Sequence, residues 1–301
     1  MNLDLNLNTS YSQSNKTIMA QRIAVVLQKG GVGKSMVTEN LAAALAESGQ
    51  RVVVIDFDPQ GHLTEGVGLK EQYLEDHHTL YDKLLEDDRV QPRRSSEANS
   101  MEKFPTHELI MKAPQDKFDV IPATYKMMLA EQDLYRSRGR EQKLDKLLAE
   151  IERDYDWILV DCPPSLGVLT DNALYATRQV VIPIQAEKTS VRALNLLLDQ
   201  IESIERGLGV QIEILAIVPN LVQPSGLAEQ TLKDLRESVP YVLDFEIGKR
   251  VVLQYAWDQG RSIFTYQPQS RQQQEVQQEV VNKFKDLATF VVNRIKGQSH
   301  E

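Results

Sequence analysis

Short apolar runs alternate with amphipathic stretches along most of the chain after residue 20. Two of these runs, RVVVID at 51–56 and WILVDC at 157–162, are almost continuously apolar. Strands buried between two layers of helices have this character, whereas strands with one wet face alternate. The pattern therefore predicts an α/β fold with a doubly wound, mostly parallel sheet flanked by helices. The expected strands are 22–27, 51–56, 118–122, 157–161, 179–184 and 213–219.

Apolar residues at helical spacing fill the intervals between the expected strands. A helix is predicted after the first strand, and Gly49 is a suitable stop signal for it. Its apolar positions are Val37, Leu41, Ala44 and Leu45. The same spacing recurs later in the chain at Leu194, Leu197, Leu198, Ile201 and Ile204.

One folded unit accounts for nearly the whole chain. We expect a mobile N-terminal tail at 1–20, where large apolar residues are few, and a short C-terminal tail at 297–301. A single domain is expected over 21–296, since no repeat and no second composition regime is visible. Within it, 71–115 is predicted to be a surface excursion, because charges, prolines and the segment SSEANS interrupt the pattern around a short helical piece at 80–85.

The composition is that of an acidic globular protein. The 301 residues include 34 Lys and Arg and 43 Asp and Glu, a net charge of −9, which argues against constitutive binding to nucleic acid. Cys162 is the only cysteine, so an intrachain disulfide is excluded, which suits a reducing cytoplasm. No apolar run approaches the roughly 18 residues of a membrane span, and the start does not resemble a signal peptide, so a soluble protein is expected.

A glycine-rich loop joins the first expected strand to the first expected helix. The segment IAVVLQKGGVGKS at 23–35 places Gly30, Gly31 and Gly33 where backbone N–H groups can converge on phosphate oxygens at a helix N-terminus. Lys34 should reach the terminal phosphates, and the Ser35 hydroxyl should bind magnesium. A plain glycine-rich turn, the structural alternative, needs neither residue. The segment therefore predicts a P-loop that binds ATP with Mg²⁺.

Three carboxylates follow expected strands. Asp56 and Asp58 end the second strand in VVVIDFDPQG, and Asp161 ends another in DWILVDCPPSLG. Ligands gather at the carboxyl ends of parallel strands, so we expect these acids to converge with the P-loop. A single aspartate at such a place is more often a helix or turn cap, but three together favour a site that hydrolyses the nucleotide.

The loop departs from the strict P-loop pattern, since Gln28 stands where a first glycine is expected and Lys29 precedes the glycines. With this second lysine, KGGVGKS resembles the ParA/MinD group of P-loop ATPases. The resemblance implies that Lys29 crosses a dimer interface to the nucleotide of the other subunit, in the manner of an arginine finger. It implies ATP sandwiched between two protomers, contacted by the loop residues Gly30, Gly31, Val32, Gly33, Lys34, Ser35 and Met36.

Further segments are similar to the ParA/Soj branch of this group over roughly 21–295: DFDPQG, IPATYKMMLAEQDL, GRE, DCPPSLGVLTDNAL and IPIQAE. This resemblance implies that Lys29, Lys34 and Asp58 are the catalytic residues, with Asp58 positioning the attacking water. It implies a partition ATPase whose ATP-bound homodimer binds DNA non-specifically. A ParB-like partner would stimulate its weak hydrolysis, and plasmid or chromosomal DNA would be segregated over the nucleoid in the cytoplasm.

The resemblance also assigns the remaining nucleotide contacts. Asp161 matches the Walker B position that orders Mg²⁺ mainly through water, with Ser35 and Asp56 beside the metal. Asn220 and Pro268 match the regions that border the adenine, although ordinary strand-end loops are an alternative. A ParA-like ATPase that positions a protein cargo is an alternative function, and nothing in the chain separates it from DNA partition.

Basic residues are relatively concentrated toward the C-terminus. Residues 241–301 carry eight Lys and Arg against seven Asp and Glu, a net charge of +1, which leaves −10 for residues 1–240. Dimerisation would double such a patch, and DNA affinity rises steeply with the number of phosphates contacted. Lys249, Arg250 and Arg261 are the candidate DNA contacts, with a solvated charged face as the alternative.

A MinD-like membrane switch is the competing class, because the chain ends in an amphipathic stretch. One face of it carries Val276, Val280, Val281, Phe284, Leu287 and Val291. The opposite face mixes Glu275, Glu279 and Asp286 with its lysines, whereas membrane-surface helices prefer a basic face. We therefore predict that this helix packs onto the sheet and that no membrane is bound.

Overall fold

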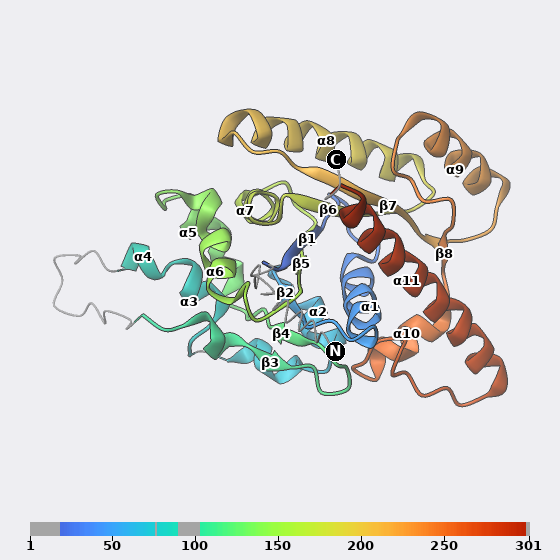
Figure 1. Cartoon of the computed structure of the whole chain (residues 1–301), viewed down its shortest axis with the longest axis horizontal. Coiled ribbons are helices and arrows are strands. Elements are labelled where there is room, and N and C mark those ends of the chain that lie inside the picture. The colour runs from blue at the N-terminus through green and yellow to red at the C-terminus, as the bar shows by residue number, and fades with distance from the viewer. Residues whose placement is uncertain (1–18, 76, 90–102, 299–301) are drawn as a thin grey trace, which may run out of the picture.

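The computed structural model describes residues 19–75, 77–89 and 103–298, so the expected N-terminal tail lies outside the described residues except for 19–20, and the expected C-terminal tail except for 297–298. A single sheet runs through the molecule with helices on both of its faces (Figure 1). Its strands are β1 (Gln21–Val25), β2 (Val52–Asp56), β3 (Met111–Lys112), β4 (Asp119–Ile121), β5 (Trp157–Asp161), β6 (Gln179–Ile184), β7 (Glu213–Val222) and β8 (Ile247–Gly248).

The strand order is β3-β4-β2-β5-β1-β6-β7-β8, and every pairing except that of β3 with β4 is parallel. This order confirms the doubly wound, mostly parallel sheet that the sequence predicts. In the register, Asp161 of β5 pairs with Val25 of β1 on one side and with Asp56 of β2 on the other. The carboxyl ends of these three neighbouring strands therefore meet at one edge, where such sheets bind their ligands.

Two helical layers cover the sheet. Apolar side chains of α1 (Lys34–Glu47), α2 (His62–Gly66), α10 (Val251–Asp258) and α11 (Arg271–Gln298) form a core with one face. The other face is covered by α3 (Leu80–Leu84), α5 (Met127–Leu134), α6 (Lys143–Ile151), α7 (Val168–Thr177) and α8 (Lys188–Leu208). The remaining helices are α4 (Glu86–Arg89), α9 (Gly226–Ser238) and the 3₁₀ turns η1 (Lys70–Leu74), η2 (Thr106–Leu109) and η3 (Arg140–Gln142).

Local sequence explains the elements that carry the loop and the acids. The strand VVVID of β2 is buried at every residue, as expected for a β-branched run between two helical layers. The alanine-rich sequence of α1 favours a helix, and Gly49, which follows it, adopts a left-handed φ of 86° that an L-residue rarely takes. The predicted stop signal is thus in place.

The C-terminal helix α11 packs as predicted. Its apolar residues Phe284, Leu287 and Val291 are fully buried, and in Figure 1 the helix runs along α1. The apolar face that a MinD-like membrane contact would require is therefore covered by the protein's own core. Within the described residues, no helix is both long and apolar enough to cross a membrane.

Candidate functional site

The glycine loop leaves β1 and enters α1 at Lys34. Gly31 and Gly33 have φ values of 73° and 81°, a left-handed conformation that glycine adopts without strain. A Cβ at Gly33 would lie 2.6 Å from Nδ2 of Asn220, so this position has no room for a side chain. At Gly30 and Gly31, in contrast, a Cβ would meet no atom within 4 Å. The loop is thus closely packed at its base and open above, as a phosphate cradle must be.

Two lysines of the loop occupy different positions. Lys34 is buried, and its Nζ lies 3.4 Å from the carbonyl oxygen of Lys29. The side chain of Lys29 turns away from that carbonyl and is held by four oxygens of the 185–190 segment. Its Nζ donates to Glu187 Oε2 at 2.6 Å, Ser190 Oγ at 2.9 Å, Thr189 Oγ1 at 3.0 Å and Gln185 Oε1 at 3.1 Å.

This contact is within one chain and is partly exposed. Lys29 holds the pKa of Glu187 below its usual value through their hydrogen bond. Gln185 also donates to the carbonyl oxygen of Gly31 at 3.1 Å, so the segment braces the loop itself. These four acceptor oxygens were not predicted from the sequence, although two of them belong to the segment IPIQAE, which is similar to the ParA/Soj branch.

Asp161 lies at the end of β5 and is fully buried. Its Oδ1 accepts a hydrogen bond from Thr38 Oγ1 at 3.3 Å, but its Oδ2 is buried and has no hydrogen-bond partner among the described residues. Burial raises the pKa of Asp161 well above its usual value, and the charge of Asp56 acts in the same direction. The side chain of Ser35 and the positive charge of Lys34 act in the opposite direction and lower the pKa. A buried carboxylate oxygen without a donor, close to a lysine and a serine, is suited to a cation or a cation-bound water.

Asp56 is also fully buried, and burial raises its pKa to about 7. Its Oδ2 accepts from the backbone N–H of Thr64 at 2.7 Å and from the Thr64 hydroxyl at 2.6 Å. Thr64 is a residue that the sequence analysis missed, because a threonine inside a helical stretch carries no signal of its own. The carboxylate of Asp56 is thus fixed from the α2 side.

Asp58 follows two residues later in the loop after β2 and is 5% exposed. Its Oδ1 accepts the backbone N–H of Gln60 at 3.0 Å, which fixes its rotamer in an Asx-type turn. Gly61, which closes this turn, has a φ of 65°, and a Cβ there would lie 2.5 Å from the ring of Tyr73. The structure therefore brings Lys34, Asp56, Asp58 and Asp161 to one edge of the sheet, as predicted from the strand ends.

Asn220 of β7 lies under the P-loop. Its Nδ2 donates to the carbonyl oxygen of Val32 at 2.7 Å, while its Oδ1 is buried and accepts no hydrogen bond from any residue that the structure describes. Met36 lies beside the same point, since its Cε would be 3.2 Å from a Cβ at Gly33. Pro268 belongs to the loop before α11, and no hydrogen bond among the described residues joins that loop to the P-loop.

The three candidate DNA contacts have different surroundings. Lys249 is exposed, and its side chain makes no hydrogen bond or ion pair with the described residues. Arg250 is paired with Glu279 at 2.8 Å. Arg261 donates from Nη1 to the carbonyl oxygen of Thr265 at 3.1 Å, and its Nε is buried. Of the three, Lys249 is thus the most available to a phosphate.

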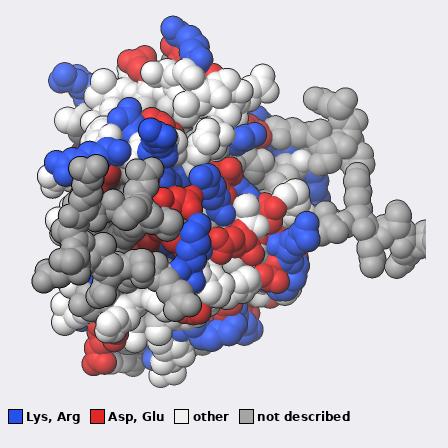
Figure 2. Space-filling model, turned by 90° about the vertical axis from the view of Figure 1, so that its left-hand side faces the viewer, with Lys and Arg blue, Asp and Glu red and all other residues white. Residues whose placement is uncertain are grey.

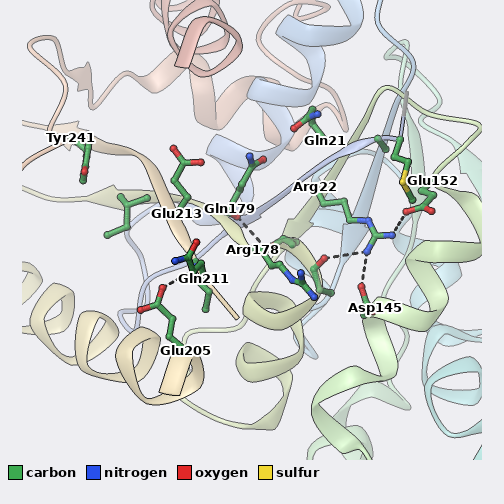
Figure 3. A pocket seen from close by; sticks show the side chains of 16 residues that line it. Gln21, Arg22, Asp145, Glu152, Arg178, Gln179, Glu205, Gln211, Glu213 and Tyr241 are labelled. Atoms are coloured by element: carbon green, nitrogen blue, oxygen red, sulfur yellow. Dashed lines mark hydrogen bonds and ion pairs between the residues drawn. The ribbon is translucent and has the colours of Figure 1, made fainter. Parts of the chain in front are cut away.

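A cavity of about 860 Å³ lies at the opposite, amino-terminal ends of β1, β6 and β7 (Figure 3). Arg22 in its wall is paired with Asp145 at 2.7 Å and with Glu152, and it donates to the carbonyl oxygen of Ala176. Glu205 accepts the backbone N–H of Ile212 at 2.7 Å. Several charged side chains of the cavity wall are thus already paired or hydrogen-bonded within the protein. The cavity is separate from the glycine loop.

Glu39 is a buried acid of α1 that none of the expected site roles uses. It is 2% exposed, and within the described part of the chain its Oε1 has no hydrogen-bond partner. Burial raises the pKa of Glu39 well above its usual value, and the charges of Asp116 and Asp161 add to this effect. The folded environment therefore favours the protonated, neutral form of this carboxyl group over its ionised form.

We expect Glu39→Gln to stabilise the protein more as the pH rises. Above the ordinary pKa the unfolded chain releases this proton while the folded chain keeps it, so folding becomes less favourable by up to about 1.4 kcal/mol per pH unit until the folded pKa is reached. Glutamine removes this penalty. Urea unfolding at pH 5 and pH 8 tests it, with exposed Glu47→Gln on the same helix as the control; a gain for Glu39→Gln that does not change with pH would contradict the account.

Known proteins resemble this chain in sequence and in fold. Residues 20–214 match the AAA domain family. The chain is 34% identical over 255 residues to the sporulation initiation inhibitor protein Soj of Bacillus subtilis, covering 84% of this chain and 94% of that protein. It is 33% identical over 269 residues to the chromosome-partitioning ATPase Soj of Treponema pallidum, covering 87% and 98%. Cobyrinic acid a,c-diamide synthase from Mycobacterium smegmatis, solved with a bound ATP analog and magnesium, is 28% identical with a TM-score of 0.66, covering 80% of this chain and 92% of that one.

Proposed function

Because this chain belongs to the ParA/Soj family of P-loop ATPases, we propose that it is a partition ATPase that binds Mg-ATP between two copies of itself. In this ATP-bound state the dimer binds DNA non-specifically. A ParB-like partner stimulates hydrolysis and so releases the dimer from DNA. The cycle segregates plasmid or chromosomal DNA.

The proposal is carried by the position of Lys34 and all three acids at one edge of the sheet, with Lys29 on the surface beside them. Lys34 lies inside the loop and Asp161 lies beneath it, where they would serve the same nucleotide. Lys29 instead points along the surface toward 185–190, away from the base of its own loop. A lysine placed on the surface beside an open phosphate cradle can reach a nucleotide held by a facing subunit. Charge supplied in this way stabilises a phosphoryl-transfer transition state.

The residues present fit magnesium and ATP. The unpartnered Oδ2 of Asp161 and the hydroxyl of Ser35 would hold Mg²⁺, directly or through water, with Asp56 as the supporting acid. No group of three His, Cys, Asp or Glu side chains among the described residues would hold a metal unaided, which suits an ion that arrives with phosphate oxygens. When bound, Mg²⁺ neutralises charge on the phosphates. Asp58 orients the attacking water from its fixed turn.

Asn220 is suited to the base of the nucleotide. Its Oδ1 is buried beside the loop and lacks a donor, which an exocyclic amino group could supply. Its Nδ2 remains bonded to Val32, so the amide is already oriented. This side chain therefore favours a base with an amino group at its edge, such as adenine.

Binding of random-sequence duplex DNA tests the proposed function. We expect fluorescence anisotropy to rise with ATP and Mg²⁺ but not with ADP, and to fall steeply with salt. Lys249→Ala should weaken binding for every sequence alike and reduce the salt dependence, whereas exposed Lys70→Ala, at a different place on the surface, should have little effect. Equal DNA binding with ATP, with ADP and without nucleotide would rule out the ATP-gated mechanism.

We expect Glu187→Gln to make ATP-dependent dimerisation easier. The carboxylate of Glu187 holds Lys29 within its own chain at 2.6 Å, and this contact must open if Lys29 is to reach another subunit. Because the pair is exposed, the expected effect is modest, a shift of about 2- to 5-fold in the ATP concentration at half-dimerisation. Light scattering during an ATP titration measures this shift. Glu202→Gln, on the helix α8 that follows Glu187, is the control, since the pair it breaks is the one with Arg206; an unchanged or higher midpoint for Glu187→Gln would contradict the expectation.

A further inference from the structure

The outer side of α5 carries an apolar patch that no described element covers. On the inner side of the helix, Met127, Ala130 and Leu134 are fully buried. Five of the eleven large apolar side chains that are exposed in the described part of the chain belong to this helix, its flanks or the adjoining η1. They are Leu74 at 74%, Tyr125 at 43%, Met128 at 50%, Leu129 at 51% and Tyr135 at 53% exposed. We call these five residues the α5 patch.

The patch is continuous across two elements. The backbone N–H of Tyr125 donates to the carbonyl oxygen of Tyr73 at 2.9 Å, which places η1 and Leu74 beside the start of α5. Met128 and Leu129 follow on the helix, and Tyr135 stands at its C-terminal end. Contiguous exposed apolar surface of this kind marks an interaction site more often than scattered single residues do.

Arginines gather at the C-terminal end of the patch in the sequence YRSRGR. Arg136 and Arg138 are exposed and make no side-chain hydrogen bond or ion pair with the described residues. Arg140 pairs with Glu141 at 2.7 Å and stacks over the ring of Tyr135 at 5.3 Å. In a chain with a net charge of −9, this end is locally basic. Guanidinium groups without partners are well suited to bind carboxylates.

On the surface around α3 to α6, many of the charged side chains are already paired within the protein. Figure 2 looks onto the side of the molecule where α3 to α6 lie, and basic and acidic side chains interleave on it. Several of these are already paired, as Lys143 is with Asp88 at 2.7 Å and Lys83 with Glu86 at 2.9 Å. Arg136 and Arg138 have no such partner among the described residues, so a second molecule can engage them without breaking a pair that the structure shows.

The helix beneath the patch touches both loops that carry the site acids. Nε2 of Gln60 approaches the sulfur of Met128 at 3.8 Å, and the backbone of Gln60 binds Asp58. On the other side, Glu131 lies against Gly167, where a Cβ would come within 1.6 Å of its Oε1, in the loop that follows Asp161 and β5. A molecule bound to the α5 patch would therefore press on the Asp58 turn and on the loop after Asp161.

We propose that the α5 patch, with Arg136 and Arg138, is the docking surface for an acidic amphipathic helix of an activating partner protein. The apolar side of that helix covers Leu74, Met128 and Leu129, and its carboxylates pair with the two arginines. This inference rests on the proposed function, because it names the kind of partner that would stimulate the ATPase. It differs from the DNA surface near Lys249, which lies beside β8 on the far edge of the sheet.

Synthetic peptides test the proposal on the full-length protein. The probes are helical peptides of about 16 residues with leucines on one face and with Glu, Gln or Lys in the first turn, labelled for anisotropy. We expect the Glu peptide to bind best and to protect 125–140 from hydrogen exchange. Its affinity should fall about tenfold in Arg136→Glu/Arg138→Glu and in Leu129→Ser. Exposed Arg153→Glu and Leu227→Ser are the controls and should bind as the wild type does.

Four results would overturn the proposal. The first is equal binding of the Glu, Gln and Lys peptides, and the second is unchanged binding by the two test variants. The third is loss of random duplex DNA binding in Arg136→Glu/Arg138→Glu, which would make this a nucleic-acid surface. The fourth is loss of ATP-dependent dimerisation in Leu129→Ser, which would make it a contact between two copies of the chain. ATP-dependent dimerisation of the wild type without peptide is measured separately, so a failure of the proposed function is distinguishable from a failure of the docking surface.

Discussion

Replacement of Asp58 by alanine should lower ATP turnover by about 10²- to 10⁴-fold while nucleotide binding persists. The reason is positional: Asp58 lies after β2, and its described hydrogen bonds are made within its own turn and not with the P-loop. Removing the carboxylate deletes the group that orients water but leaves Lys34, the glycines and Asp161 in place. Phosphate release and binding of a fluorescent ATP analogue, measured on the same sample, check the two halves of this expectation.

Asp58→Asn is the matched variant for this prediction. Its side-chain oxygen can still accept the N–H of Gln60, so the turn should keep its shape while the negative charge is lost. If turnover depends on the carboxylate, Asp58→Asn should be nearly as slow as Asp58→Ala. Turnover close to that of the wild type in either variant would show that the water is oriented by another group.

Replacement of Lys29 by alanine should abolish dimerisation and reduce turnover by about 10³-fold or more, the loss seen when a charge supplied across an interface is removed. ATP should still bind, because the contact between Lys34 and residue 29 uses the backbone carbonyl, which alanine retains. Among the described residues of the single chain, the ammonium group of Lys29 forms hydrogen bonds only with the 185–190 segment, so the fold should not depend on it.

The neighbouring exposed Lys188→Ala is the control for Lys29→Ala, since it removes a positive charge from the same surface. Analytical ultracentrifugation with ATP, together with an ATPase assay, separates the two variants. Dimers of normal stability in Lys29→Ala, or turnover within about twofold of the wild type, would remove Lys29 from the interface.

The sequence predicted the central part of the fold well, because its strands are buried on both faces. β5 and β6 have the expected limits, and β1, β2 and β4 differ from expectation by one or two residues. β7 continues to Val222, beyond the expected end, because Asn220 and Val222 pair with β8. The edge strands β3 and β8 were not predicted, since two residues carry no periodic pattern.

Pro183 shows how position overrides a local rule. A proline within a central strand is unusual, because it cannot donate a ladder hydrogen bond. In β6 the carbonyl oxygen of Val181 accepts the backbone N–H of Val26, so the backbone of Val181 faces β1. Because the strand direction alternates with a period of two residues, the nitrogen of Pro183 faces the same side. β1 has already ended there, and no donor is required.

The sequence predicted those site residues whose place follows from the order of strands along the chain. Strand ends carry Asp56 and Asp161, so parallel topology alone brings them together. The hydrogen bond from Thr64 to Asp56 and the oxygens that surround Lys29 could not be predicted in this way. These side chains come from other elements, and their orientation depends on rotamers that neither spacing nor composition specifies.

An equal mixture of the Lys29→Ala and Asp58→Ala proteins tests most directly whether ATP is shared between two subunits. In a mixed dimer, the nucleotide on the Lys29→Ala subunit keeps its own Asp58 and receives Lys29 from the partner, so one of the two sites is complete. We therefore predict that two inactive proteins regain turnover on mixing, about a quarter of the wild-type rate if pairing is random and up to about half if the Lys29→Ala protein pairs only with the Asp58→Ala protein. No gain over the separate proteins, with mixed dimers shown to form, would contradict the central claim that Lys29 acts on the nucleotide of the other subunit.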